Sequence, residues 1–430
     1  MKKIYLLLTF LITLCLTAKA ENPEIERLMQ EGIELHSMGE FERAIEKYNE
    51  ILRIDSTNIS AIYEIALSYL ALGNYGNAIR YTAKVIHSRD PSLSIGAYAI
   101  QSEALAALDR TEEAIALLES VLAIRGSEYL LHFNLALNHY KLNDLENTLI
   151  HVQTAIDLDK THAEAFLLYA YVLNDKELWV RSIFAFQMFL LLKPDDHRSR
   201  TAFEELLHIM RITTLGEDEA DVLPNVIPPL NTVDGINRYL IYNTITASLD
   251  SLRANSEEDD LFTAFKTVNR NIILLLNEKN DGSVERMSKF WTFYVPFFTR
   301  IVESEHYETF ARYISVSYFP ESFEWWQENP EYAENFVIWF EEGDEYEYEE
   351  EYEYYEYRYE TYEVFDYQPP VYVPVITQQE RPNFFQRITS NLRTQQVEED
   401  NSVEIGVDNE NNEEENSEKE PAEWWRIWRR

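Results

Sequence analysis

Two histidines, His132 and His139, stand seven residues apart, so a helix would place both on one face. Imidazole nitrogens are common zinc ligands, but a zinc site needs at least a third protein ligand. The nine histidines of the chain are scattered, and no third partner is evident near this pair. A hydrogen-bonded or surface histidine is therefore the simpler interpretation, and the sequence predicts no metal site.

Carboxylates are the most abundant reactive groups, and their pairs are too frequent to mark a catalytic site. The stretch DNENNEEE, residues 408–415, resembles part of a calcium loop but lacks its turn glycine, which indicates weak, unselective cation binding at most. The sequence contains no glycine-rich phosphate loop, no HExxH motif and no serine elbow. It predicts no catalytic residue and no cofactor.

The first twenty residues have the pattern of a secretory signal peptide. Lys2 and Lys3 precede a mostly apolar run from Ile4 to Leu16, and Ala18-Lys19-Ala20 follows shortly after it. The apolar run is shorter than the roughly 20 residues that a membrane-spanning helix requires. We expect an exported protein that is periplasmic or envelope-associated. The only cysteine, Cys15, lies within this run, so the mature chain would contain no thiol.

The chain is strongly acidic, with a formal net charge of -39. Affinity for nucleic acid depends on basic residues that neutralise phosphates, so nucleic acid is excluded as a partner class. Basic proteins or cations suit a polyanion better.

One acidic stretch, EYEYEEEYEYYEYRYETYE at 345–363, alternates carboxylates with phenols. Like charges on one face oppose a β-sheet and extend the chain, so residues 343–430 are predicted to be a disordered acidic tail. The chain then ends in a basic, aromatic segment, whose residues are Trp424, Trp425, Arg426, Trp428, Arg429 and Arg430. Arginine can pair with carboxylates and stack on phenols, which predicts a clasp between this segment and residues 345–363. Peripheral contact with an anionic membrane is the alternative.

A period of 34 residues is present in the N-terminal half. Small residues recur in two columns, first at Gly32, Ala66, Ser102, Ala136 and Ala170, then at Ala44, Ala78, Ala114, Thr148 and Ser182. Between them runs a mostly bulkier column of Phe41, Tyr75, Thr111, Leu145 and Trp179. Small residues are needed where two helices touch, so each period predicts a helical hairpin, with Gly39 and Gly73 in its turns. One interval has 36 residues, which predicts a loop insertion near Pro91.

These columns resemble the tetratricopeptide repeat family, in five copies. The resemblance implies an all-α fold in which residues 25–212 form a superhelix of five hairpins and a capping helix. It also implies a concave groove lined by the first helix of each hairpin. The groove positions are Met29, Ile33, Tyr63, Leu67, Leu70, Phe133, Leu137, Tyr140, Leu167, Leu168 and Tyr171.

The predicted groove is largely apolar and aromatic. Relatives that bind chaperones clamp a peptide carboxylate with lysines, arginines and asparagines, and only Asn134 and Lys141 are candidates for that role here. The predicted ligand is therefore an apolar helix or peptide. Packing against neighbouring hairpins is the alternative explanation for the same residues.

Acids and prolines interrupt the helical pattern at 213–229, which predicts a linker. Apolar residues at helical spacing and many aromatics follow, so residues 230–342 are predicted to be a small helical domain. Its aromatic run is similar to the region that follows the repeats in some repeat proteins of Bacteroidetes-like bacteria, a resemblance that implies no activity. Aromatic stripes at this spacing more often form a core than a cofactor site.

Two function classes are compatible with these features. The first is an exported scaffold that binds a protein or peptide partner in cell-envelope assembly or maintenance. The second is an envelope enzyme, or an enzyme subunit, with its chemistry in residues 230–342; converging acids with raised pKa values in a pocket would favour it. The scaffold is preferred because no catalytic constellation is visible and such repeats are chiefly binding surfaces. The sequence leaves the oligomeric state open.

Overall fold

The computed structural model describes residues 22–88, 90–212, 236–255, 260–283 and 286–342. Helices supply the regular structure of these residues, so the predicted all-α fold is confirmed. Contacts divide the described chain into two compact units, of which the first ends at Thr148 and the second begins at Leu149. Among the described residues, no helix has both the length and the apolar content needed to cross a bilayer.

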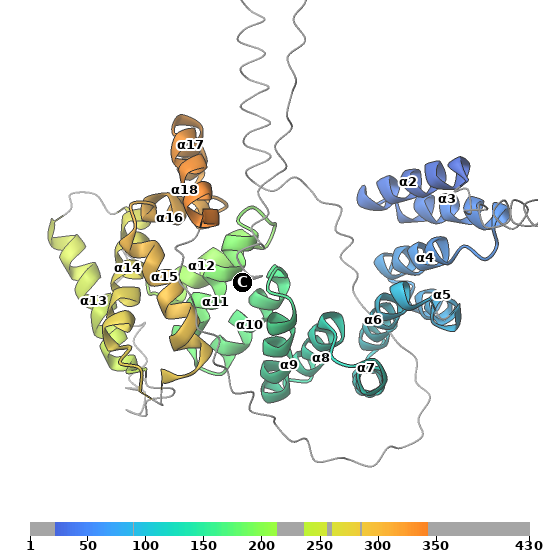
Figure 1. Ribbon diagram of the computed structural model, residues 1–430, viewed down its shortest axis with the longest axis horizontal. Helices are drawn as coiled ribbons and strands as arrows, with labels where there is room; N and C mark the ends of the chain where they lie inside the picture. Colours follow the sequence, from blue (N-terminus) through green and yellow to red (C-terminus); the bar gives the residue numbers. More distant parts are fainter. Residues whose placement is uncertain (1–21, 89, 213–235, 256–259, 284–285, 343–430) are drawn as a thin grey trace, which may run out of the picture. The chain divides into compact units, whose positions relative to one another are not determined.

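In the first unit, each helix packs against the next one along the chain (Figure 1). The helices are α2 (Pro23–Ser37), α3 (Phe41–Ile54), α4 (Ile59–Ala71), α5 (Tyr75–Ser88), α6 (Pro91–Ala107), α7 (Thr111–Arg125) and α8 (Tyr129–Lys141). Asn22, Asn58 and Asp90 each accept a hydrogen bond from a backbone N–H in the first turn of α2, α4 and α6. Such side-chain caps satisfy N–H groups that the helix itself leaves unpaired.

Both predicted small-residue columns lie where helices touch. All ten positions are buried, in the second unit as well as in the first. At Gly32, an added Cβ would lie 2.8 Å from Cζ and 2.9 Å from Cδ1 of Tyr48, whose ring is fully buried on α3. Glycine is required there because α2 and the Tyr48 ring leave no room for a methyl group.

The turn inside each hairpin has one residue with a left-handed backbone. These residues are Gly39 (φ 78°), Gly73 (φ 69°), Asp109 (φ 59°), Asn143 (φ 59°) and Glu177 (φ 58°). They occupy the same repeat position, and their N–H groups bond back to the last turn of the preceding helix. The prediction that glycines mark the turns is correct for the first two copies, and the later copies make the same turn without glycine.

The prediction of a loop insertion near Pro91 is wrong. Pro91 opens α6, which has 17 residues where α4 has 13. Proline suits the first turn of a helix because its missing N–H would have no partner there. The extra residues of the third copy therefore lengthen a helix at its N-terminus.

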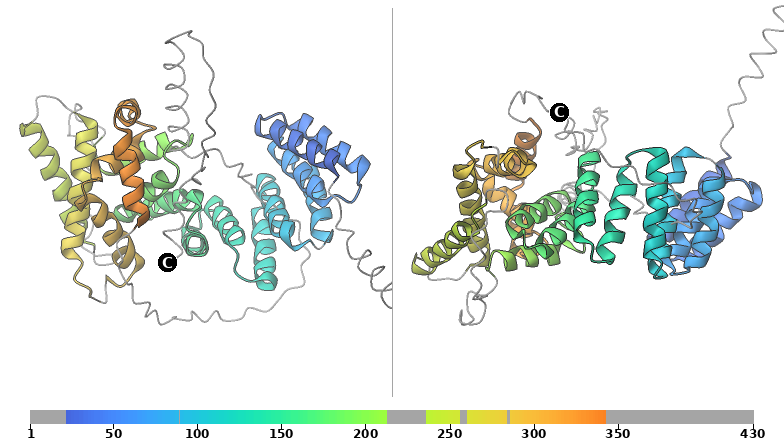
Figure 2. Two further views of the ribbon diagram at one scale, coloured as in Figure 1. Left: turned by 45° about the horizontal axis from the view of Figure 1, so that its top comes forward. Right: turned by 90° about the horizontal axis from the view of Figure 1, so that it is seen from below.

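The second unit begins within α9 (Leu145–Leu158) and contains the remaining helices. They are α10 (Ala163–Asp175), α11 (Trp179–Leu192), α12 (Ser199–Ile209), α13 (Arg238–Asn255), α14 (Leu261–Lys279), the π-helical turn η3 (Phe290–Tyr294), α15 (Val295–Glu303), α16 (Tyr307–Ser315), α17 (Pro320–Glu328) and α18 (Pro330–Glu342). Figure 2 shows these helices from two further directions. The predicted capping helix is α12, and a left-handed residue, Arg211, follows it as in the hairpin turns.

Aromatic rings form the core of the second unit. Phe184 on α11 meets Phe290 and Phe298 edge to face, with ring centroids 5.1 and 5.2 Å apart. Phe203 on α12 meets Phe265 on α14 at 4.8 Å. Because these rings come from both sides of the predicted linker, α11 and α12 bury their apolar faces against the helices that follow them.

A buried polar contact joins the same elements. Gln187 on α11 and Asn269 on α14 exchange two amide hydrogen bonds of 2.9 and 3.0 Å, and both side chains are fully buried. Asn269 also donates to the hydroxyl of Tyr307, which donates to the backbone carbonyl of Lys266 at 2.7 Å. Because buried amides need hydrogen-bond partners, this exchange fixes one register between α11 and α14.

The predicted signal peptide, the linker at 213–229 and the tail at 343–430 lie outside the described residues. The predicted helical domain at 230–342 corresponds in the structure to α13 through α18. Its aromatic residues form a core, as the packing interpretation expects.

Candidate functional site

The predicted groove residues all lie on the first helices of their hairpins. They are Met29 and Ile33 on α2, Tyr63, Leu67 and Leu70 on α4, Phe133, Leu137 and Tyr140 on α8, and Leu167, Leu168 and Tyr171 on α10. Five are buried and six are half-buried. Packing therefore accounts for part of the set, and the half-buried members are those that a ligand could contact.

Tyr63 and Phe133 are mainly packing residues. Each is only 9% exposed. The Tyr63 ring rests on α6, where a Cβ at Gly96 would lie 2.6 Å from the Tyr63 hydroxyl oxygen. Phe133 stacks on Tyr129 with ring centroids 5.8 Å apart. These two rings are held by their packing and leave only an edge for a ligand.

In the first unit, the half-buried members of the predicted groove set are Met29, Ile33, Leu70, Leu137 and Tyr140. Met29 packs against the buried cluster that contains Tyr48, and Leu70 packs against the buried cluster that contains Ala66. Each is held in place on one side by buried neighbours and is partly open on the other. A ligand that covered these side chains would gain free energy by removing apolar surface from water.

One charged side chain, Glu64, lies within this apolar part of α4. Burial raises its pKa to about 7, and its carboxylate forms no ion pair or hydrogen bond with the described residues. Burial also raises the pKa values of Tyr48 and Tyr63, and the negative charge of Glu64 raises them further. The Tyr48 hydroxyl is buried with no hydrogen-bond partner among the described residues. The site therefore combines a carboxylate that is costly to ionise with two phenols that stay neutral.

The histidine on the adjacent helix does not neutralise Glu64. His36 Nδ1 lies 3.0 Å from the Ser68 hydroxyl, which donates to the backbone carbonyl of Glu64 at 2.9 Å. Burial lowers the pKa of His36 below its ordinary value, so the imidazole is neutral at pH 7. A positive charge for Glu64 must come from outside this group of side chains.

Neither candidate for a carboxylate clamp is free to act as one. Asn134 is buried and donates to the Leu130 carbonyl at 2.8 Å. Lys141 bonds the Ala106 carbonyl and lies 3.4 Å from an Asp109 carboxylate oxygen. Both side chains therefore already have partners within the chain.

Hydrogen bonds occupy both histidines of the α8 face. His132 Nε2 lies 2.9 Å from the Ser127 hydroxyl, and His139 Nδ1 lies 3.0 Å from an Asp144 carboxylate oxygen. Burial lowers the pKa of His132. Among the described residues, no three histidine, cysteine or acidic side chains come close enough to hold a metal ion.

A small recess lies between α13 and α14 in the second unit. Its lining residues are Thr244, Ala247, Ser248, Ser251, Leu252, Thr267 and Asn271. Asn271 donates to the Ser248 hydroxyl at 2.8 Å across the recess. None of these lining residues is titratable, so the recess lacks the converging acids that the enzyme alternative requires.

The basic C-terminal residues 424–430 and the acidic stretch 408–415 lie outside the described residues. The predicted clasp and cation-binding stretch therefore stay sequence predictions.

A family model supports the repeat assignment. Residues 60–90 match the tetratricopeptide repeat model. This match assigns one tetratricopeptide repeat to the chain. The matched residues cover most of α4 and all of α5, the second of the five predicted copies. Glu64, Tyr63 and Leu67 thus belong to the copy that fits the family model.

Several solved structures are similar to part of this chain. TTC0263 of Thermus thermophilus is 18% identical, with a TM-score of 0.39, and the match covers 43% of this chain and 99% of that one. PilF of Pseudomonas aeruginosa is 17% identical, with a TM-score of 0.37, and the match covers 44% and 85%. YrrB, described as having an unusual peptide-binding site, is 19% identical, with a TM-score of 0.29, over 43% and 93%. No curated protein sequence matches the chain.

Glu64 is the site residue that sequence reasoning missed. Glu64 is one of 76 aspartates and glutamates, so its residue type alone does not mark it. A local signal was present, because Glu64 is the only charged residue in the helix ISAIYEIALSYLA. A single charge on an otherwise apolar helix marks a polar group that its surroundings do not solvate.

Proposed function

We propose that the chain is an exported scaffold whose first unit binds an apolar segment of a partner protein. The segment carries a lysine or arginine that pairs with Glu64. The observation that carries this proposal is the half-buried carboxylate of Glu64. Glu64 lies on an otherwise apolar helix and has no cation partner among the described residues.

The energetics favour a partner that brings a positive charge. A carboxylate in an apolar setting is disfavoured when ionised, and an opposite charge within a few ångströms restores the ionised form. A bound ammonium or guanidinium group would therefore gain more at Glu64 than at an exposed acid, where ion pairs contribute little. Met29, Ile33 and Leu70 would supply the apolar contact beside it.

The N-terminal sequence supports the cellular setting of this proposal. The pattern of residues 1–20 supports export, and therefore a periplasmic or envelope location. A surface that binds a partner protein suits a role in assembling or maintaining the cell envelope.

Affinity capture from envelope extracts at pH 7.5 tests the proposal. The unmodified chain, Glu64→Gln and Leu70→Ser are compared by quantitative mass spectrometry, with Glu46→Gln as the matched control. Glu46 is an exposed acid on α3. A specific partner should be retained by the control and reduced about tenfold by Glu64→Gln, since a buried charge pair is worth more than about 1.4 kcal/mol.

Circular dichroism confirms that each variant is folded. Capture of the same proteins in equal amounts by all four chains would refute the proposed surface. If Leu70→Ser reduces capture of the partner but Glu64→Gln does not, the apolar surface is supported and the partner does not need a basic residue.

A further inference from the structure

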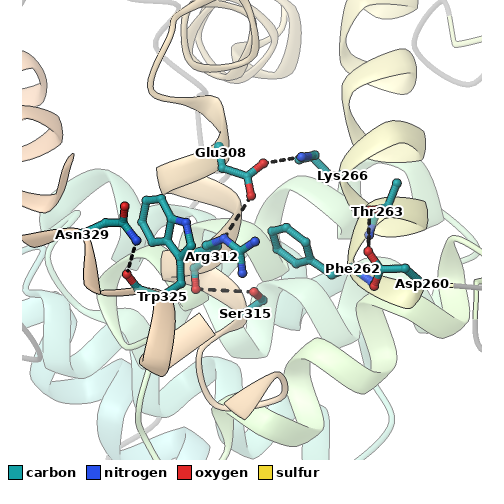
Figure 3. Close-up of polar contacts among 9 residues, drawn as sticks. All are labelled: Asp260, Phe262, Thr263, Lys266, Glu308, Arg312, Ser315, Trp325 and Asn329. Atoms are coloured by element: carbon teal, nitrogen blue, oxygen red, sulfur yellow. Dashed lines mark hydrogen bonds and ion pairs between the residues drawn. The ribbon is translucent and has the colours of Figure 1, made fainter. Parts of the chain in front are cut away.

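Arg312 on α16 occupies an unusual position in the second unit. Its guanidinium carbon lies 4.4 Å from the centre of the Phe262 ring and 5.2 Å from the centre of the Trp325 ring. Figure 3 shows the guanidinium group between these rings, which come from α14 and α17. The two aromatic faces fix the plane of the cation.

One side of the Arg312 guanidinium already has an acceptor. Its Nε donates to Glu308 Oε1 at 2.9 Å, and the other oxygen of Glu308 pairs with Lys266 on α14 (Figure 3). Two cations thus share one carboxylate, which leaves one excess positive charge in a chain whose net charge is -39.

The terminal nitrogens of Arg312 have no acceptor among the described residues. The side chain remains 17% exposed, so part of it is accessible to solvent. A planar guanidinium with a fixed orientation and free N–H groups matches the two oxygens of a carboxylate. Its chemistry therefore calls for an acidic ligand.

We propose that Arg312 binds carboxylates of the acidic stretch 345–363 of the same chain. This stretch holds nine glutamates and eight tyrosines, and only one basic residue. It follows α18, and Tyr332 on α18 has its ring 5.7 Å from that of Trp325. Helix α18 therefore contacts Trp325, which forms one side of the Arg312 site, and leads to the start of the acidic stretch.

The chain length permits this return. Helix α18 has 13 residues and is about 20 Å long. An extended chain advances about 3.3 Å per residue, so roughly six residues after the end of α18 span the length of this helix. The chain can therefore return from the C-terminal end of α18 to its N-terminal end. Glutamates from Glu349 onward can therefore reach Arg312, and tyrosines between them can contact the half-buried Trp325. Tethering keeps these groups at an effective concentration of about 1 mM, so weak individual pairs are enough.

Zero-length crosslinking of the full chain tests the proposal. A condensing reagent joins lysine amines to adjacent carboxylates, and Lys266, which is 31% exposed, reports on acids that approach Arg312. We expect crosslinks between Lys266 and residues 345–363. They should fall about tenfold in Arg312→Gln, the loss expected for one charge-assisted pair, and also at 1 M salt, where the Debye length is about 3 Å.

Arg200→Gln is the matched control. Arg200 lies over the Tyr318 ring at 5.2 Å and pairs with Glu204, so it is also a stacked, ion-paired arginine. Its loss should leave the Lys266 crosslinks unchanged. A second variant, with Glu349, Glu350 and Glu351 changed to glutamine, alters only the stretch and should reduce crosslinks to the acids that remain.

Three outcomes would overturn the proposal. The first is absence of crosslinks from Lys266 to residues 345–363. The second is an equal yield in Arg312→Gln and Arg200→Gln when both are folded by circular dichroism. The third is crosslinks only between copies, detected by mixing isotope-labelled and unlabelled chains, which would assign the acidic ligand to a second molecule.

Discussion

At the scale of single residues, the first unit is closely packed around one acidic side chain, Glu64, which has no ion-pair partner among the described residues. Gly32 and Gly96 allow the rings of Tyr48 and Tyr63 to rest on neighbouring helices. Close packing of this kind partly buries Glu64, whose pKa rises because burial disfavours its charged form. The cost of ionising Glu64 is therefore a consequence of how closely the helices pack.

The pH dependence of stability should reveal that cost. The folded pKa of Glu64 is about 7, against an ordinary value of 4.5. Between these values the folded chain holds a proton that the unfolded chain releases, so stability falls as pH rises from 4.5 to 7 and is then constant. Glu64→Gln should raise the free energy of unfolding by on the order of 1–3 kcal/mol at about pH 8 and by almost nothing at about pH 4.

Urea unfolding at both pH values measures this difference, with Glu46→Gln as the control for loss of an exposed acid. Other acids titrate alike in the variant and the parent, so they cancel in the comparison. Equal effects of Glu64→Gln at the two pH values would contradict a strained carboxylate.

Two glycines in the first unit should respond oppositely to the same change. Gly32→Ala pushes a methyl group into the buried Tyr48 ring and should destabilise the unit by about 1–3 kcal/mol. Gly76→Ala meets no atom within 4 Å at the start of α5 and should stabilise it by about 0.5 kcal/mol through helix propensity. Thermal unfolding of the two variants checks this, and a stabilising Gly32→Ala would show that α2 and α3 are less closely packed.

At the scale of elements, the sequence predicted helices better than the details of their turns. The recurring small residues located the hairpins because close helix contact leaves no alternative to a small side chain. The turn of the fifth copy could not be read from Glu177, since its left-handed backbone is imposed by hydrogen bonds to the preceding helix. The helix that replaces the predicted loop at Pro91 was missed because proline both opens helices and occurs in loops.

Glu177 offers a direct measure of what the turn costs without glycine. A left-handed conformation costs a residue with a Cβ about 1 kcal/mol more than it costs glycine. Glu177→Gly should therefore be more stable than Glu177→Ala by roughly 1 kcal/mol, less the greater freedom of glycine in the unfolded chain. Both changes remove the same exposed carboxylate, so the alanine variant is the control. Equal unfolding midpoints in urea would show that the turn relaxes.

At the scale of the whole molecule, the sequence predicted the order of elements but not how they share a core. Prolines and acids predict a boundary at 213–229, yet composition cannot show which faces a later helix covers. The partners of Phe184, Gln187 and Phe203 lie 62 to 114 residues further along the chain. Periodicity indicates that a face is apolar and does not identify its partner. The sequence therefore placed the groove residues on the first helices of the hairpins. It did not show which of these residues are buried and which remain partly exposed.

This shared core changes the expected behaviour of the repeat region when it is cut out. A fragment of residues 21–212 loses α13 through α18, which exposes Phe184 and Phe203 and leaves the buried Gln187 without Asn269. Removing one partner from a buried hydrogen bond costs more than the bond itself contributes. We expect α3 through α7 to stay protected from amide hydrogen exchange, whereas α11 and α12 exchange at least about tenfold faster than in residues 21–342, which corresponds to about 1.4 kcal/mol of local stability. Equal protection of α11 and α12 in the two fragments would show that the five hairpins and α12 are stable without the aromatic helices.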